Sequence, residues 1–199
     1  MACKPLVTHP TMRIVAGNLK GRRLAAPEGR DIRPTADRTR QALFDVLEHG
    51  HLIEGGGSAL VDAVVVDAFC GTGALGLEAL SRGAAEATFM DSNRDGLDCA
   101  RANAKALGVT GNFILADATN PPRSRKPANL IFLDPPYGAN LGASALTALL
   151  AAGWMAPGAI VSIEMSGREL STFEAPSGFT RIDERRYGKA RILLLRAGT

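Results

Sequence analysis

The chain has 199 residues, of which 46% are hydrophobic and 22% charged, and its formal net charge is +3 at pH 7. No apolar run is long enough to cross a membrane, and residues 1–10 lack the apolar core of a secretion signal, which argues against a membrane or secreted protein. The three cysteines lack paired spacing and the three histidines lack a ligand pattern, so we expect a cytoplasmic protein without disulfides or a bound metal.

The first forty residues hold nine Lys and Arg residues against three acidic residues, so the positive charge is concentrated there. Two short apolar segments, 13–16 and 23–25, flank a polar stretch with a glycine at each end, and this pattern predicts a hairpin with a basic tip. A loop over 27–34 follows. Thr35 or Asp37 can then cap a helix.

A basic arm on a near-neutral body favours contact with the phosphates of a nucleic acid, whereas an ordinary solvated surface is the alternative. The sequence Gly-Gly-Gly-Ser at 55–58 reads as a flexible joint. It predicts a boundary between a basic extension, residues 1–54, and a second domain, residues 55–199. The residues expected to contact phosphate are Arg13, Lys20, Arg22, Arg23, Arg33, Arg38 and Arg40.

A glycine motif follows the joint. The mostly apolar run at 61–69 predicts a strand, and Cys-Gly-Thr-Gly-Ala-Leu-Gly at 70–76 leads from it into an amphipathic helix, as in nucleotide-binding crossovers. Gly71 and Gly73 let the backbone approach a ligand, and the helix N-terminus offers N–H groups. The spacing also fits a dinucleotide fingerprint, with Asp91 where the ribose-binding acid is expected, so the motif alone leaves the ligand undecided.

Asp67, four residues before Gly71, bears on that choice. A carboxylate at this position would repel a pyrophosphate, because both carry negative charge. The same carboxylate can help to hold the ammonium group of S-adenosylmethionine, directly or through water. Asp67 therefore favours a methyl donor over a dinucleotide.

Strand-like and helical segments then alternate, which predicts a parallel sheet. The tail differs, because two strand-like segments joined by Tyr-Gly-Lys predict a terminal antiparallel hairpin. The expected fold class is α/β and Rossmann-like, with a seven-stranded, mostly parallel sheet. After the strand at 61–69, strands are expected at 87–91, 112–116, 130–134, 159–164, 179–186 and 190–195, and helices at 74–82, 94–107 and 142–152.

The sequence Asp134-Pro135-Pro136-Tyr137 follows an apolar run at 130–133. Two successive prolines donate no backbone hydrogen bonds, so the strand must end there in a stiff, extended turn. Open α/β sheets bind ligands at this edge. The group suits a flat base with an exocyclic amine, since Asp134 and the Pro135 carbonyl each accept an N–H bond and Tyr137 stacks on the ring. A plain proline-rich turn with a helix-capping Asp is the alternative.

The chain resembles the RsmD family of class I S-adenosylmethionine-dependent methyltransferases, from about Arg13 to Arg196. The Asp-Pro-Pro-Tyr motif alone is shared with adenine-N6 and other amino methyltransferases, whereas the arm together with the long glycine motif is specific. The resemblance is carried by Arg-Ile-Val-Ala-Gly at 13–17, Lys-Gly-Arg-Arg-Leu at 20–24, Arg-Pro-Thr-x-Asp-Arg-x-Arg at 33–40, the segment from Phe69 to Arg82, and 134–137.

The resemblance implies transfer of a methyl group from S-adenosylmethionine to the exocyclic N2 of one guanine in 16S ribosomal RNA. Ribosomal RNA or the small ribosomal subunit is then the partner, held by the basic arm. The implied catalytic residues are Asp134, Pro135, Pro136 and Tyr137. The implied cofactor-binding residues are Asp67, Phe69, Gly71, Gly73, Asp91 and Asp117.

Two of these acids have specific expected partners. Asp91 is expected to bind the ribose hydroxyls, and Asp117 to meet the adenine amino group, with a turn-forming role as the alternative for Asp117. Three other functions remain open at this point. They are a DNA adenine-N6 methyltransferase, an NAD-dependent oxidoreductase, and a non-catalytic ribosome-assembly factor that binds RNA through the arm.

Overall fold

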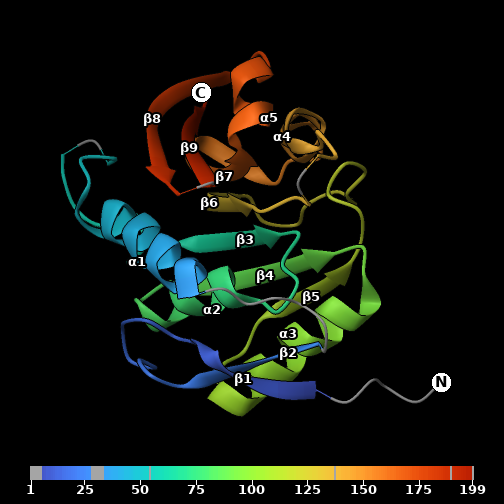
Figure 1. Cartoon of the computed structure of the whole chain (residues 1–199). Coiled ribbons are helices and arrows are strands. Elements are labelled where there is room, and N and C mark those ends of the chain that lie inside the picture. Colours follow the sequence, from blue (N-terminus) through green and yellow to red (C-terminus); the bar gives the residue numbers. More distant parts are fainter. Residues whose placement is uncertain (1–5, 28–33, 54, 137, 189, 199) are drawn as a thin grey trace.

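The computed structural model describes residues 6–27, 34–53, 55–136, 138–188 and 190–198. Its centre is a seven-stranded sheet in the order β5-β4-β3-β6-β7-β9-β8 (Figure 1). The five strands from β3 to β7 run parallel, whereas β9 pairs antiparallel with both β7 and β8. The predicted fold, a mostly parallel seven-stranded sheet ending in an antiparallel hairpin, is therefore confirmed. The strands are β3 (Val64–Ala68), β4 (Glu86–Asp91), β5 (Asn112–Leu115), β6 (Ala128–Leu133), β7 (Met155–Ser166), β8 (Phe179–Tyr187) and β9 (Ala190–Ala197).

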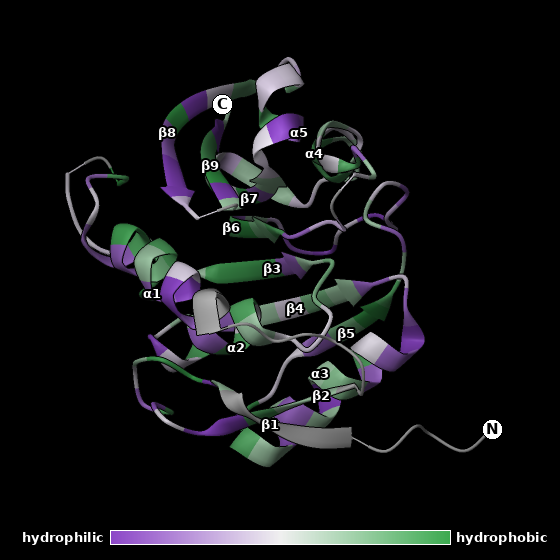
Figure 2. Ribbon diagram, viewed as in Figure 1, coloured by the Kyte–Doolittle hydropathy of each residue, from purple (hydrophilic) through white to green (hydrophobic). Residues whose placement is uncertain are grey.

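Helices cover both faces of this sheet, and each face has its own hydrophobic core. Neighbouring residues of one strand enter opposite cores, as Val65 and Val66 do in β3. Burial on both faces explains why the central strands read as mostly apolar runs, which Figure 2 shows as mainly green ribbon in β3 and β6, with a purple segment near the end of β3. One face packs against α1 (Pro34–His49), α2 (Ala74–Ser81) and α3 (Arg94–Leu107), and the other against α4 (Gly142–Ala151) and α5 (Gly167–Thr172).

The N-terminal segment forms a two-stranded antiparallel sheet of β1 (Leu6–Arg13) and β2 (Arg23–Pro27), so the predicted hairpin is present. Strand β2 lies along α3 (Figure 1), where Asn103 Oδ1 accepts the Ala25 N–H at 2.8 Å and its Nδ2 donates to the Ala25 carbonyl at 3.0 Å. Ile14 and Leu24 are fully buried in the core that includes β3 and α2. The extension and the sheet thus share a core, and the division of labour between residues 1–54 and 55–199 stays a prediction.

Several element boundaries differ from those expected. Strand β1 ends at Arg13, where the first hairpin segment was expected to begin, and β7 begins four residues earlier than predicted. Helix α1 begins at Pro34, so Thr35 and Asp37 lie in its first turn and do not cap it, since proline with its fixed φ suits the first helical position. Strand β3 begins three residues later than predicted. Val61 is 59% exposed and Asp62 has a φ of 58°, in a turn where the Asp62 N–H donates to the Gly83 carbonyl at 2.9 Å.

Candidate active site

The turn between β3 and α2 has an unusual backbone. Gly71 and Gly73 take positive φ values of 52° and 78°, as a tight turn before a helix allows. Phe69 also has a positive φ, 66°, which for a bulky residue costs about 1–3 kcal/mol and is found where the surrounding structure imposes it, often at functional sites. The sequence marked Phe69 only through its motif, because a side-chain identity does not reveal a strained φ.

Asp67 lies in β3 beneath this turn and is buried. Its Oδ2 accepts the Gly76 N–H at 2.9 Å, in the first turn of α2. Burial raises the pKa of Asp67 well above its ordinary value, and the nearby charges of Asp134 and Asp91 act in the same direction, while the Gly76 hydrogen bond lowers it. A buried carboxylate of this kind gains from a cationic partner.

Gly76 has a packing role in addition to its place in the motif. A Cβ atom there would lie 2.5 Å from the ring of Phe89 and 3.2 Å from the Cβ of Asp67, so only glycine lets α2 approach β3 and β4 this closely. Gly73 is similar, since its Cβ would lie 3.0 Å from that of Ala100 in α3. The glycine spacing is therefore required by helix–sheet packing as well as by any ligand.

Asp91 ends β4 beside the same turn. Its Oδ2 accepts the Gly71 N–H at 2.7 Å and its Oδ1 accepts the Asn93 N–H at 2.8 Å. The carboxylate is thus fixed next to the glycine turn, as its spacing predicted. Each oxygen has a second lone pair with which to accept a hydroxyl donor.

Asp117 follows β5 at the same edge of the sheet and is exposed. Its Oδ1 accepts both the Thr119 N–H and the Thr119 hydroxyl, each at 2.8 Å. This is the turn-forming role that the sequence left as an alternative. Contact between Asp117 and an adenine stays a prediction.

The Asp-Pro-Pro segment begins directly after β6, next to the end of β3, because these strands pair with Asp67 opposite Phe132 and Ala68 opposite Leu133. The charge of Asp134 helps to raise the pKa of Asp67, which reflects how close the two carboxylates are. Pro135 is buried and Pro136 exposed. Tyr137 lies outside the described residues. The structure thus brings Asp67, Asp91 and Asp134 to one edge of the sheet.

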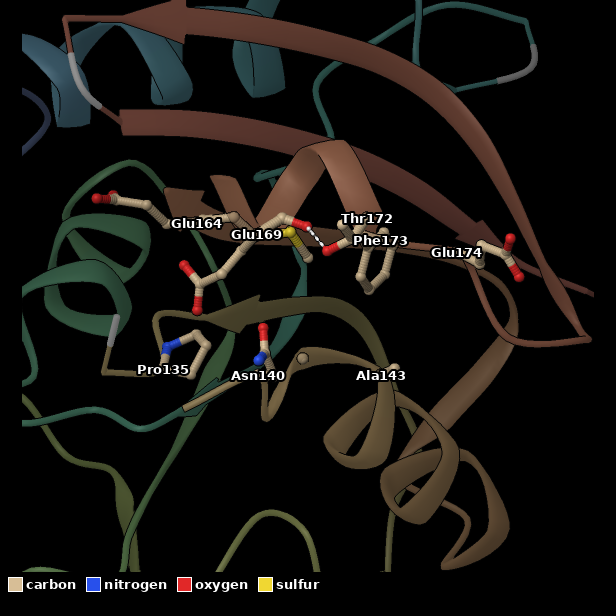
Figure 3. Close-up of a pocket in the computed structure, with 10 residues that line it drawn as sticks. Pro135, Asn140, Ala143, Glu164, Glu169, Thr172, Phe173 and Glu174 are labelled. Atoms are coloured by element: carbon tan, nitrogen blue, oxygen red, sulfur yellow. Dashed lines mark hydrogen bonds between the residues drawn. The ribbon is translucent and has the colours of Figure 1, made fainter. Parts of the chain in front are cut away.

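A pocket of about 200 Å³ opens beside Pro135 of this segment. Figure 3 shows the Glu169 carboxylate in it, turned toward Pro135. Its lining combines the carboxylates of Glu164, Glu169 and Glu174 with the ring of Phe173. No sequence pattern indicated this pocket, since its lining comes from separated stretches of chain.

The basic residues predicted to contact RNA take different positions. Arg40 is buried, with its side chain 6% exposed, and its Nη2 donates to the Arg13 carbonyl at 2.6 Å and to Asp37 Oδ1 at 2.7 Å. This corrects the prediction for Arg40, because a buried guanidinium paired inside the protein does not reach a phosphate. Arg33 lies outside the described residues. The exposed residues are Arg13, Lys20, Arg22, Arg23 and Arg38.

Arg22 is exposed but also has a partner, since its Nη2 donates to the Ala106 carbonyl at 2.7 Å in the last turn of α3. A cation at a helix C-terminus satisfies an otherwise unpaired carbonyl and interacts favourably with the helix dipole. Arg22 therefore helps to dock the hairpin on α3, whatever else it binds.

Glu78 in α2 is a residue whose role the sequence did not reveal. It is fully buried, and its carboxylate accepts the N–H groups of Val15 at 2.7 Å and Ala16 at 2.9 Å. Arg82, one turn later, donates to Glu78 Oε1 at 2.9 Å, and Arg40 Nε lies 3.8 Å from Oε2. One helix thus carries the glycine turn at its start and holds the N-terminal segment through Glu78.

Among the described residues, no group of three or more His, Cys, Asp or Glu residues is arranged to hold a metal ion. In the same part of the chain, no helix is both long and apolar enough to cross a membrane. Cys70 and Cys99 are buried, and burial raises the pKa of the Cys70 thiol, so Cys70 packs as a neutral thiol.

Comparison with known proteins places these features in a family. Residues 12–196 match the family model described as "Conserved hypothetical protein 95". Ribosomal RNA small subunit methyltransferase D of Escherichia coli is 35% identical over 161 residues, covering 77% of this chain and 74% of the relative. The protein of the same name from Haemophilus influenzae is 29% identical over 185 residues, covering 89% of each chain.

A solved structure gives the same fold. The putative methyltransferase yhhF from Escherichia coli superposes with a TM-score of 0.77 at 28% sequence identity, covering 94% of this chain and 98% of that chain.

Proposed function

Because the chain belongs to the RsmD family, we propose that it transfers a methyl group from S-adenosylmethionine to the exocyclic N2 amine of a guanine in small-subunit ribosomal RNA. The observation that carries the proposal is the adjacency of two groups on neighbouring strands. The buried Asp67 lies under the strained glycine turn at the end of β3, and Asp134-Pro135 ends β6 beside it.

The residues present suit the methyl donor. Asp67 is a buried carboxylate at the position where the ammonium group would lie, and Asp91 is fixed beside the turn with acceptor capacity for the ribose hydroxyls. Gly71 and Gly73 leave the backbone open to close approach. When bound, S-adenosylmethionine supplies an electrophilic methyl group on a sulfonium centre.

Asp134 and Pro135 act on the nucleophile. The lone pair of guanine N2 is delocalised into the ring, so the amine is a weak nucleophile. If the Asp134 carboxylate and the Pro135 carbonyl each accept one N–H, the nitrogen becomes pyramidal and its lone pair points at the methyl group, which is a gain from orientation. The carbon–sulfur bond breaks as the carbon–nitrogen bond forms. The nitrogen, now cationic and acidic, loses one proton to Asp134.

Two further parts of the proposal concern RNA. Tyr137 stacks on the extruded base, which contributes about 1–3 kcal/mol to base binding. Residues 1–54 act as the RNA-binding extension, while residues 55–199 carry the methyl-donor site. The exposed side chains of Arg13, Lys20 and Arg23 support RNA binding by residues 1–54.

The test has two steps. Titration calorimetry with S-adenosylmethionine, its demethylated product and NAD should show binding of the first two only, and NAD binding alone would contradict the assignment. Small subunits from cells lacking this protein should then accept one methyl group in its presence. Mapping of the modified nucleotide should give N2-methylguanine, whereas N6-methyladenine would make the enzyme an adenine methyltransferase.

A further inference from the structure

A side chain from α5 reaches the turn that follows the Asp-Pro-Pro segment. The Oε1 atom of Glu169 accepts the Gly138 N–H at 2.8 Å. Figure 3 shows this carboxylate directed toward the β6 end, between Pro135 and the first turn of α5. Glu169 thus connects two segments that are 31 residues apart in the chain.

The other oxygen of Glu169 is fixed at the start of its own helix. Glu169 Oε2 accepts the Ser166 N–H at 2.9 Å and the Ser166 hydroxyl at 2.6 Å, and the Glu169 N–H donates back to Ser166 Oγ at 3.2 Å. This reciprocal arrangement is a capping box, which satisfies N–H groups that the helix leaves unpaired. The carboxylate of Glu169 therefore does more than cap its helix, because its other oxygen, Oε1, accepts the Gly138 N–H of a separate loop.

The two prolines limit the backbone hydrogen bonds that this segment can donate. Pro135 and Pro136 have no N–H group, so the backbone there cannot donate to a neighbouring strand. Gly138, with a φ of 81°, gives its N–H to Glu169, and the next described backbone bond, from the Ala139 N–H to the Pro136 carbonyl, is longer at 3.4 Å. Glu169 therefore helps to hold the turn that follows the Asp-Pro-Pro segment, through the N–H groups of Gly138 and Asn140.

We propose that Glu169 is a positioning residue, which holds Gly138 and so keeps Asp134 and the Pro135 carbonyl in the arrangement that the target amine requires. This inference rests on the proposed function. Strand β7, which leads into α5, is the neighbour of β6, so Glu169 fixes the loop to the adjacent strand of the sheet. The hydrogen bonds from Ser166, Gly138 and Asn140 lower the pKa of Glu169, with burial acting in the opposite direction, so the carboxylate is ionised at neutral pH.

Loss of this contact should affect turnover more than binding. A shift of about 1 Å in a positioning group can slow a reaction by up to ~100-fold. Glu169→Ala should therefore lower the single-turnover methylation rate by about 10- to 100-fold, with little change in the affinity for S-adenosylmethionine. Glu169→Gln keeps one acceptor oxygen for Gly138, so it should recover a large part of the rate.

Two matched variants separate positioning from helix stability. Ser166→Ala removes the capping hydroxyl but leaves the backbone donors of Ser166 and Gly138 to the carboxylate, so it should lower the melting temperature and keep the rate within about twofold. Glu174→Gln removes another carboxylate of the same pocket, one that is exposed, and should leave the rate unchanged.

The measurements are single-turnover methyl transfer to small subunits, calorimetry with S-adenosylmethionine, and thermal unfolding of each variant. Wild-type rates in Glu169→Ala would overturn the inference, as would an equal loss of rate in Glu169→Ala and Ser166→Ala. If Glu169→Ala does not fold, the comparison of Glu169→Gln with Ser166→Ala decides instead. An inactive wild-type protein would contradict the proposed function and, with it, the role of Glu169 in positioning the amine, whereas an active wild-type protein with an unimpaired Glu169→Ala variant would contradict that role alone.

Discussion

The backbone of Gly17 lies so close to Ser81 that a Cβ atom on Gly17 would stand 1.9 Å from the Ser81 carbonyl oxygen. The same carbonyl accepts the Asn18 N–H at 2.7 Å, and the Ser81 hydroxyl donates to the Ala16 carbonyl at 2.6 Å and accepts the Leu19 N–H at 3.0 Å. The loop between β1 and β2 is therefore docked on the last turn of α2.

We expect Gly17→Ala to destabilise the protein by about 2 kcal/mol or more, since it adds a clash with backbone to the cost of a φ of 77°. Gly21→Ala is the control, because Gly21 has a φ of 80° and no atom within 4 Å of a built Cβ. The Gly21→Ala substitution should lower the free energy of unfolding by only about 1 kcal/mol. Denaturant unfolding measures both, and equal losses would show that the contact with Ser81 contributes nothing.

A fragment of residues 55–199 should fail to fold stably. It would remove from the Glu78 carboxylate the N–H groups of Val15 and Ala16 and the Arg40 guanidinium, while Arg82 stays as a partner. Each hydrogen bond lost from a buried carboxylate costs about 1–3 kcal/mol. It would also uncover the face of the sheet that α1 packs against. Circular dichroism and thermal unfolding test this prediction. A cooperative transition near that of the full chain would show that the extension is separable.

Binding of S-adenosylmethionine should release a proton from Asp67. Burial first, and then Asp134 and Asp91, raise the pKa of this carboxyl, while an ammonium partner would lower it again. Calorimetric binding enthalpies should therefore depend on the ionisation enthalpy of the buffer, and affinity should rise with pH. Asp67→Asn is the control, since it removes the proton of Asp67 but keeps any proton that the ligand itself releases. A buffer dependence in this variant equal to that of the wild type would contradict the prediction.

The same shift predicts how the ligand-free protein responds to pH. A carboxyl with a raised folded-state pKa stabilises the fold below its unfolded pKa, about 4 for Asp. That contribution is lost as the pH rises through the folded-state pKa. Asp67→Asn should therefore flatten the pH dependence of unfolding on the side above about pH 4.

Asp134→Ala should lower the methylation rate by about 100-fold or more, because it removes an acceptor that orients the target amine. Affinity for S-adenosylmethionine should change little, since in the proposed function Asp134 accepts from the target amine and does not contact the donor. Single-turnover kinetics and calorimetry on the same preparation separate the two effects. A variant that kept most of its rate would disprove the role of Asp134 as an amine acceptor.

Replacing Lys20 and Arg23 together with Ala should make RNA affinity less dependent on salt, by roughly one to two units of slope on a log–log plot, because each phosphate contact releases counterions. Both side chains are exposed, so folding should be unaffected. Arg40→Ala should show the reverse pattern of effects. It should lower the stability of the fold, because Arg40 is paired inside the protein, and it should change the salt slope little. An unaltered slope in the first variant would place the RNA on another surface.

The sequence predicted those features that depend on local pattern. Alternating apolar segments predicted the sheet and its terminal hairpin, and two consecutive prolines predicted that β6 ends next to them, one residue later than its observed end at Leu133. Asp91 was located by spacing, because strand and helix lengths fix which side chain ends β4 beside the turn. In each case the determining residues lie within one or two elements.

Features that depend on contacts between distant segments were not predictable in this way. Arg40 reads as one more cation of a basic arm, yet the fold buries it against Glu78, 38 positions further along the chain. The link from Glu169 to Gly138 depends on β6 and β7 being neighbours in the sheet, which no local pattern encodes. Thr35 likewise has the identity of a helix cap, but the proline before it starts the helix earlier.

The docking of the N-terminal segment also constrains the order of folding. Its hydrogen bonds to Glu78 and Ser81 close loops of about sixty residues, and those to Asn103 and Ala106 close longer ones. During synthesis, residues 6–27 leave the ribosome well before α2 and α3 exist, so their native partners are absent at first. Closing long loops costs conformational entropy, which is offset only by the contacts that form once the sheet and helices are in place. The basic hairpin is thus synthesised before the helices that it packs against, and it acquires its native contacts late.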